Sequence, residues 1–437
     1  MADDDGLKRE VGLWGLTSNI VNIVIGSGIF VLPAIVAEQL GAAGILAYLF
    51  CGFLITVIML CFAEVGSKVT VAGGAYAYIE EAFGGYIGFV TTLLFVFGSS
   101  LMASAAVANA LAQTAAYLVP AFSGYWARIA FLIFIYAGLA FINVRGVKRG
   151  IGLVKLTTLA KLIPLLLLLI FGAFQLKAQN LAWETNPTWD ALGSVSLILF
   201  FAFQGAENSL SISGEVKQPN RVIPRAILLG FLIILVSYIA LQLVAQGVLG
   251  SAFAQFKQAP LGEVARRVMG PLGVTLLSAG ATVSMLGYLS SDSLSMPRVL
   301  FRAAKDGVLP FPKLAQVHSR FATPHVAIVC YAALGCTVAI TGEFRQLAIY
   351  ASSFALLIYL GVALSVIKLR RVRPAGSFQI PGGLTVPVVA VLTVGWFLSH
   401  LTGKEAMGVG AFLGAATLSY GVLRYVRRPK PPQDTEI

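Results

Sequence analysis

Gly26-Ser27-Gly28 are the residues of this 437-residue chain whose types and spacing first suggest chemistry. They interrupt an apolar stretch, residues 13–37, that is long enough to cross a bilayer, since a spanning helix needs about 20 residues. A break at half depth frees backbone N–H and C=O groups where lipid offers no hydrogen-bond partner. Protein or a bound solute must satisfy them, so the pattern indicates a ligand site near the membrane midplane. The alternative is a glycine that only lets two helices touch.

A second apolar stretch, residues 191–213, has the same feature. It carries Gln204, Gly205, Glu207 and Asn208 at mid-depth, and such polar groups are costly in lipid unless they face a cavity or a partner. The two interrupted stretches occupy corresponding places in two halves of the chain. Paired interrupted helices at equivalent places in inverted repeats indicate the binding site of a secondary transporter.

The amino-acid composition indicates the class of protein to which the chain belongs. Hydrophobic residues make up 58% of the chain and charged residues 11%, and the mean hydropathy is +0.85. That leaves too little polar surface to cover a soluble protein of this length. We therefore predict an all-α polytopic membrane protein.

Twelve apolar ranges are predicted to span the membrane, as two five-helix inverted repeats and two further helices. A cytoplasmic tail (1–12) precedes one transmembrane transporter domain (13–425), and a second cytoplasmic tail (426–437) follows it. The first repeat covers about 13–176, the second about 191–369 and the last two helices about 386–425. The twelve ranges are 13–37, 44–67, 86–118, 127–143, 153–176, 191–213, 225–249, 271–301, 324–341, 346–369, 386–401 and 408–425.

The basic residues orient these ranges. With the N-terminus inside, 21 of the 31 lysines and arginines fall in cytoplasmic segments and 7 in external ones. This excess fits the positive-inside rule and predicts a multi-pass protein of the cell inner (cytoplasmic) membrane with both termini cytoplasmic. The net charge of +12 then belongs to an anionic membrane surface, and we expect no nucleic acid partner.

Several kinds of site find no support in the sequence. The four cysteines lie inside predicted spans without C-x-x-C spacing, and the three histidines are far apart, so we expect no metal, no cofactor and no disulfide. An enzyme would need an acid, base, nucleophile or metal set, and a channel would need a continuous polar ring. We expect a non-enzyme whose partners are a small-molecule substrate and the bilayer, with no obligatory protein subunit evident.

The chain also resembles the amino acid, polyamine and organocation transporter superfamily, most closely bacterial amino-acid permeases related to the L-type transporters. One departure is Thr70, where the family usually has a proline. The resemblance implies the five-plus-five inverted-repeat fold of the leucine-transporter type, with helices 1 and 6 broken. It rests on four groups of residues: Gly26-Ser27-Gly28-Ile29-Phe30; Ala63-Glu64-Val65 with residues 72–78 and Phe83-Gly84; Phe203-Gln204-Gly205-Ala206-Glu207 with residues 214–226; and Pro297-Arg298-Val299-Leu300-Phe301 with residues 306–310.

A substrate-binding site follows from the helix ends. The N–H groups of Ser27 and Gly28, at the positive end of the outer half-helix, should hold a substrate carboxylate. By resemblance, the ammonium lies on the carbonyls of Val24, Phe201 and Gln204, and Phe201 is the aromatic lid on the outer side. An ordinary packing role for that phenylalanine is the alternative. The full set of expected substrate-binding residues is Val24, Gly26, Ser27, Gly28, Ser99, Phe201, Gln204, Gly205, Ala351 and Ser352.

Three charged residues inside the spans are expected to act in coupling or gating. Lys161 must snorkel, pair or lose its proton at its depth. By resemblance its ammonium stands where sodium-coupled relatives hold sodium, bridging spans one and eight; a purely structural tether is the alternative. The resemblance also implies that Glu207 links outer gating to substrate or proton. For Asp292 three roles stay open, namely pairing with Lys161 or Arg298, proton relay, and preference for a cationic side chain.

These residues favour a sodium-independent secondary transporter of amino acids, a permease or exchanger that works by alternating access. The alternatives are a proton-coupled transporter of polyamines or cationic amino acids and, less favoured, a channel. The sequence does not name the amino acid. Glu64, at the inner end of the second span, is expected to be a structural partner of the loop that follows it.

Overall fold

The computed structural model describes residues 11–68, 75–145, 151–183, 186–209, 216–257, 259–305, 309, 311–372 and 378–426. Within these residues all regular structure is helical, apart from one isolated bridge between Val11 and Val216. Nearly all of both predicted tails lies outside the described residues, as do Thr70 and parts of three family stretches (72–74, 214–215, 306–308 and 310).

The helices of the first half follow the predicted ranges. The first range is divided into two helices, and the third is one rod that contains a π-helical turn. The elements are α1 (Leu13–Val24), α2 (Gly28–Leu40), α3 (Ile45–Lys68), α4 (Ala75–Phe83), α5 (Gly85–Leu93), the π-helix η2 (Leu94–Ser100), α6 (Leu101–Leu118), α7 (Tyr125–Arg145) and α8 (Ile151–Ala173).

The second half repeats the pattern of one divided range followed by long helices. The elements are α9 (Trp189–Leu199), the 3-10 turn η5 (Phe200–Phe203), α10 (Ala206–Ser209), α11 (Pro219–Leu249), η7 (Gly250–Gln255), α12 (Pro260–Lys305), α13 (His325–Thr341), α14 (Phe344–Val372), α15 (Thr385–Ser399) and α16 (Gly403–Val426). Short 3-10 turns η1 (Gly41–Gly44), η3 (Pro120–Ser123), η4 (Ala178–Leu181) and η8 (Pro312–Ala315) lie between helices.

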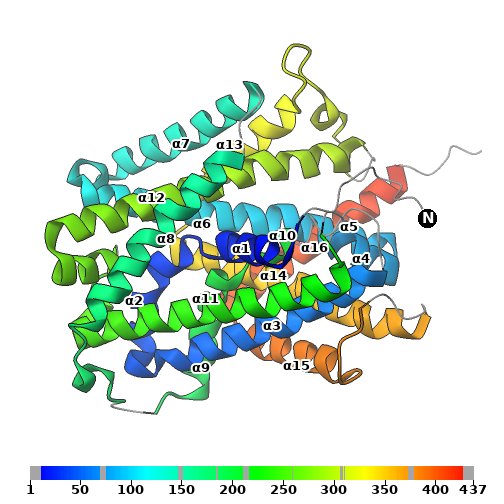
Figure 1. The fold of residues 1–437 in the computed structure, drawn as a ribbon. Helices are drawn as coiled ribbons and strands as arrows, with labels where there is room; N and C mark the ends of the chain where they lie inside the picture. Colours follow the sequence, from blue (N-terminus) through cyan, green and yellow to red (C-terminus); the bar gives the residue numbers. More distant parts are fainter. Residues whose placement is uncertain are drawn as a thin grey trace, which may run out of the picture.

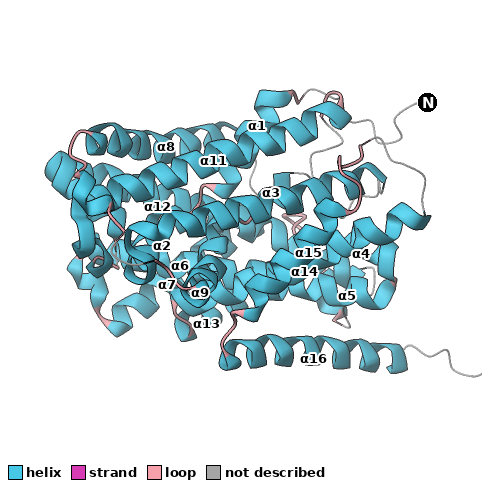
Figure 2. Ribbon diagram, turned by 90° about the horizontal axis from the view of Figure 1, so that it is seen from below, coloured by secondary structure: helices cyan, strands magenta, loops and turns pink. Residues whose placement is uncertain are grey.

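The helices form an elongated bundle. Figure 1 shows the long helices running along one common direction, with α7 and α13 on one flank and α9 and α15 on the opposite flank. Figure 2 shows α16 as a rod along one side of the bundle, where it packs on α5 and α14. Large apolar side chains on the outer helices are exposed, among them Trp126, Phe134 and Leu418, as expected for surfaces that face lipid.

Seven helical stretches of the described chain are long and apolar enough to cross a membrane, and five further apolar helices are shorter. The protein is therefore a multi-pass helical membrane protein. Two of the shorter helices belong to the two divided ranges, where the breaks cut one apolar stretch into halves. The number of helices that cross the bilayer stays a prediction.

One boundary differs clearly from the predicted range. Helix α12 begins at Pro260, whereas the range was expected to start at Pro271. The chain bends at Gly270, whose φ of 68° is non-helical, so residues 260–269 form a separate arm. This arm is stabilised by an ion pair between Glu263 and Arg266, one turn apart.

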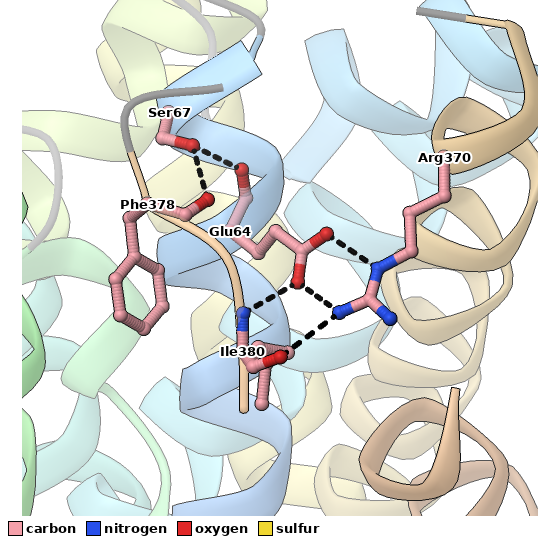
Figure 3. Close-up of polar contacts among 5 residues, drawn as sticks. All are labelled: Glu64, Ser67, Arg370, Phe378 and Ile380. Carbon is pink, nitrogen blue, oxygen red and sulfur yellow. Dashed lines mark hydrogen bonds and ion pairs between the residues drawn. The ribbon is translucent and has the colours of Figure 1, made fainter. Parts of the chain in front are cut away.

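A buried ion pair fixes α3 against α14 (Figure 3). The Arg370 guanidinium donates from Nε to Glu64 Oε1 (2.6 Å) and from a terminal nitrogen to Glu64 Oε2 (2.5 Å). The Ile380 N–H also donates to Glu64 (2.9 Å), and Ser67 donates to the Phe378 carbonyl (2.9 Å). Glu64 thus holds the segment after α14; the loop directly after α3, which was its expected partner, lies outside the described residues (69–74).

Candidate functional site

The first break lies between α1 and α2, at residues 25–27. Lys161 reaches it from α8 and donates from Nζ to the carbonyls of Asn22 (2.5 Å) and Ile25 (2.8 Å). These are carbonyls at the C-terminal end of α1, where the last turn lacks intrahelical donors and the helix dipole favours a cation. The Lys161 side chain is buried, so this ammonium satisfies the acceptors that the break exposes.

The second break lies between η5 and α10. Gly205 has a φ of 103°, which only glycine adopts without strain. Its N–H donates to Glu207 Oε2 (3.1 Å), and the same carboxylate oxygen accepts from Tyr359 Oη of α14 (2.7 Å). Gln204 donates from Nε2 to Ser352 Oγ, also on α14, at 2.9 Å. The structure thus brings Gln204, Gly205 and Glu207 together with Ser352.

The segments at the two breaks are in close contact at Gly28, the first residue of α2, which packs on Ala202 of η5. A Cβ added at this glycine would lie 2.7 Å from both Cα and Cβ of Ala202 in η5, closer than real Cβ atoms approach backbone. Gly26 has more room, because the nearest atom to an added Cβ is the Val24 carbonyl oxygen at 3.8 Å. Gly28 is therefore required for the close contact between the breaks, in addition to its expected place at the N-terminus of α2.

Tyr238 of α11 joins both breaks, and the sequence interpretation missed it. Its Oη lies 2.9 Å from the Ala202 carbonyl and 3.2 Å from the Val24 carbonyl, and its one proton serves one of them at a time. The available signal was a tyrosine deep in an aliphatic stretch, since a buried phenol needs a hydrogen-bond partner. The Val24 carbonyl also accepts from the Gly26 N–H (2.7 Å), so in this conformation this expected ammonium ligand already has protein partners.

Phe201 lies at the side of the site toward the start of α14. Its ring is buried and packs edge-to-face on Phe344, with ring centroids 5.8 Å apart. Ala351 and Ser352 are fully buried about two turns further along α14. Ser99 is buried in the π-helix η2, which packs against α14. The expected lid and pocket residues therefore lie on elements around the second break.

Asp292 lies in a cluster of hydroxyl groups. Ser100 Oγ donates to Oδ1 (2.5 Å) and Tyr331 Oη donates to Oδ2 (2.9 Å), and the carboxylate is buried between η2, α12 and α13. Lys161 and Arg298 donate to backbone carbonyls instead. The Asp292 side chain is therefore held by neutral donors in this conformation, and ion pairing with either cation is not observed among the described contacts.

The described residues give no support for a metal site or a disulfide. No group of three or more histidine, cysteine, aspartate or glutamate residues there is placed to hold a metal ion. The four cysteines are free thiols. What the arrangement offers is backbone polarity at two helix breaks, the Lys161 ammonium, the buried Asp292 carboxylate, the half-buried Glu207 carboxylate and the packed rings of Phe201 and Phe344.

Comparison with known proteins gives a consistent result. The family model described as "Amino acid permease" matches residues 11–406. The serine/threonine exchanger SteT of Bacillus subtilis is 29% identical over 431 residues, covering 95% of this chain and 97% of that protein. The b(0,+)-type amino acid transporter 1 of Rattus norvegicus is 27% identical over 88% of this chain and 81% of its own length. The methylthioribose transporter of Bacillus subtilis is 26% identical over 95% and 93%.

Proposed function

This chain belongs to the amino acid permease family, and on that basis we propose that it carries amino acids across the membrane as a sodium-independent permease or exchanger. Relatives named as a serine/threonine exchanger and as an amino acid transporter support this substrate class. The observation that carries the proposal is the pair of facing helix breaks, each of which exposes backbone polar groups inside an apolar bundle.

The proposed architecture is twelve membrane-spanning helices with a five-plus-five inverted repeat and both termini in the cytoplasm. Three observations support it. A described helix lies in each of the twelve expected ranges, and the breaks fall in the first and sixth. The split of basic residues favours the same orientation. Alternating access would then expose the breaks to one face of the cytoplasmic membrane at a time.

Substrate binding is proposed to use the backbone at the breaks. As the N-cap and the first residue of α2, Ser27 and Gly28 have N–H groups without intrahelical acceptors, at the positive end of the helix dipole, where a carboxylate is stabilised. The ammonium would lie toward the η5 end of the second break, near the carbonyls of Phe201 and Gln204. Phe201, on Phe344, would cover the site from outside, and its release would open the path.

Sodium independence is proposed from Lys161. Its ammonium already lies on two carbonyls at the first break, and in a coupled transporter a bound cation would satisfy such acceptors. A tethered ammonium satisfies these carbonyls without a sodium ion from solution.

One observation favours a second candidate function, proton-coupled transport of polyamines or cationic amino acids. Asp292 is a buried carboxylate with only neutral hydroxyl donors among its described contacts.

The test is flux of labelled amino acids into liposomes that contain the purified protein. Saturable uptake of unmodified amino acid that persists when choline replaces sodium is the expected result. Strict sodium dependence would contradict the role given to Lys161. Uptake that requires an imposed proton gradient and prefers cationic substrates would favour the second candidate, whereas flux that does not saturate would indicate a channel.

A further inference from the structure

A cavity of about 480 Å³ opens at the end of the bundle where α2 ends and α7 begins. Its lining comes from α2, α6, α7, Lys257 after η7 and the junction between α13 and α14. Phe344 is part of that lining and packs on Phe201, so the cavity lies on the other side of the aromatic cover from the helix breaks. Its volume falls within the roughly 300–1,000 Å³ of small-molecule sites in proteins.

Arg128 is an anchored cation in the wall of this cavity. One terminal nitrogen of its guanidinium donates to Asn109 Oδ1 (2.5 Å) and to the carbonyls of Ala339 (3.0 Å) and Gly342 (3.2 Å). Asn109 is itself buried and held by the same two carbonyls. The Arg128 side chain is thus fixed in place by neutral groups.

The charge of Arg128 is only partly compensated by these contacts. The carbonyls belong to the C-terminal end of α13, and a helix end carries about half a negative elementary charge. No carboxylate is among the described partners of Arg128, and its second terminal nitrogen has no described acceptor. An anionic group of a solute can therefore bind there by charge-assisted hydrogen bonds.

Four other charged residues line the cavity, and only two of them form an ion pair with each other. Glu38 and Lys257 form an ion pair (2.6 Å) and largely compensate each other. Glu343 and Arg345 also line the cavity, and neither side chain has a described partner. Glu343 directly follows Gly342, the residue whose carbonyl binds Arg128. The cavity wall therefore carries a cation, Arg128, and an anion, Glu343, whose preceding residue is an acceptor of Arg128.

We propose that this cavity is an external subsite for the zwitterionic backbone of an α-amino acid, in which Arg128 binds the carboxylate and Glu343 the ammonium. The proposal rests on the proposed function, which makes this end of the bundle the outer face. A solute held there stands directly over Phe344 and Phe201 and passes to the helix breaks when the two rings separate. The subsite selects the part that all α-amino acids share, before any side-chain pocket acts.

The experiment measures half-saturation separately on the two faces in right-side-out membrane vesicles. The probe is labelled L-serine or, if serine is not carried, the labelled amino acid with the highest flux in the liposome assay. For Arg128→Gln we expect external half-saturation to rise about tenfold, as for loss of one hydrogen bond to a charged group, with internal half-saturation unchanged. The carboxamide of the same amino acid should compete equally with variant and wild type.

Matched variants separate binding from folding. Glu343→Gln should raise external half-saturation several-fold, and it removes no described contact, so it tests the subsite even if Arg128→Gln does not fold. Arg267→Gln, at an exposed arginine of the same end of the bundle but outside the cavity lining, should leave both half-saturations unchanged.

Two results would overturn the subsite. One is unchanged external half-saturation in folded Arg128→Gln and Glu343→Gln; the other is an equal rise on both faces, which indicates a structural role alone. A wild-type protein that carries no amino acid at all would defeat the proposed function, whereas active transport with unaffected variants defeats only the subsite.

Discussion

The two helix breaks are satisfied in opposite ways. At the first break the exposed groups are carbonyl acceptors, and a cation from another helix, Lys161 of α8, binds two of them. At the second break the exposed group is the Gly205 N–H donor, and an anion of the same segment, Glu207, accepts from it. Each break thus has a charged side chain of the sign that its backbone polarity favours.

The two breaks are also joined to different helices. The contact at the first break ties α1 to α8, and α8 in turn packs along α12. At the second break Glu207 binds an N–H of its own segment, and two side-chain contacts, Tyr359 with Glu207 and Ser352 with Gln204, join the break to α14. Tyr238 and Gly28 then join the two breaks to each other.

The largest effect is expected for Gly28→Val, which separates the two breaks. A branched side chain cannot fit 2.7 Å from the Ala202 backbone, so η5 must shift. We expect transport to be abolished and the thermal midpoint to fall, as measured by liposome flux and by a melting curve in detergent. Gly138→Val, on α7 away from both breaks, is the control, because nothing lies within 4 Å of an added Cβ there; equal damage by the two substitutions would refute the packing argument.

Lys161→Ala should remove the cation that binds the carbonyls at the first break. It leaves the Asn22 and Ile25 carbonyls without their donor, and a hydrogen bond to a charged group contributes about 1.5–3 kcal/mol, so flux should fall roughly tenfold or more. Lys161→Gln, which keeps one donor group, should be less impaired. Sodium should not restore flux in either variant. Wild-type flux in Lys161→Ala would show that the break needs no fixed cation.

Glu207→Ala should have a smaller effect, because the contact of Gln204 with Ser352 still joins the second break to α14. The Gly205 N–H and Tyr359 Oη both lose their acceptor, each at a cost of about 1–3 kcal/mol if it stays buried. We expect a several-fold lower maximal flux with sodium independence kept. Glu207→Gln keeps an acceptor oxygen and should be milder. A loss larger than that of Lys161→Ala would reverse the proposed ranking of the two breaks.

Phe201→Ala is expected to change selectivity more than rate. The ring covers the second break against Phe344, so its removal enlarges the site on that side. Flux should fall modestly, and more amino acids should compete for uptake in a panel of the twenty. Phe344→Leu, which keeps an apolar contact, should retain the wild-type ranking. An unchanged ranking in Phe201→Ala would return this ring to ordinary packing.

The two helix breaks were predictable because the residues that break a helix are visible in the sequence. Gly26, Gly28 and Gly205 stand out in apolar stretches, and the breaks fall where they were expected. Lys161 stands out because a charge at that depth needs a partner. The expected contacts of Lys161 with the eighth range and of Asp292 with a cation do not appear among the described hydrogen bonds, since the nearest available groups were carbonyls and hydroxyls.

By itself, the sequence determined the class of protein, the positions of the helices and the two breaks, because apolar length and helix-breaking residues are local properties. The tertiary structure alone decided the partners: Tyr238 on two carbonyls, Asp292 in a hydroxyl cluster and Glu64 on Arg370, which is 306 residues away. Such pairs depend on which faces of distant helices meet, and helical periodicity shows that a face is buried without showing against what.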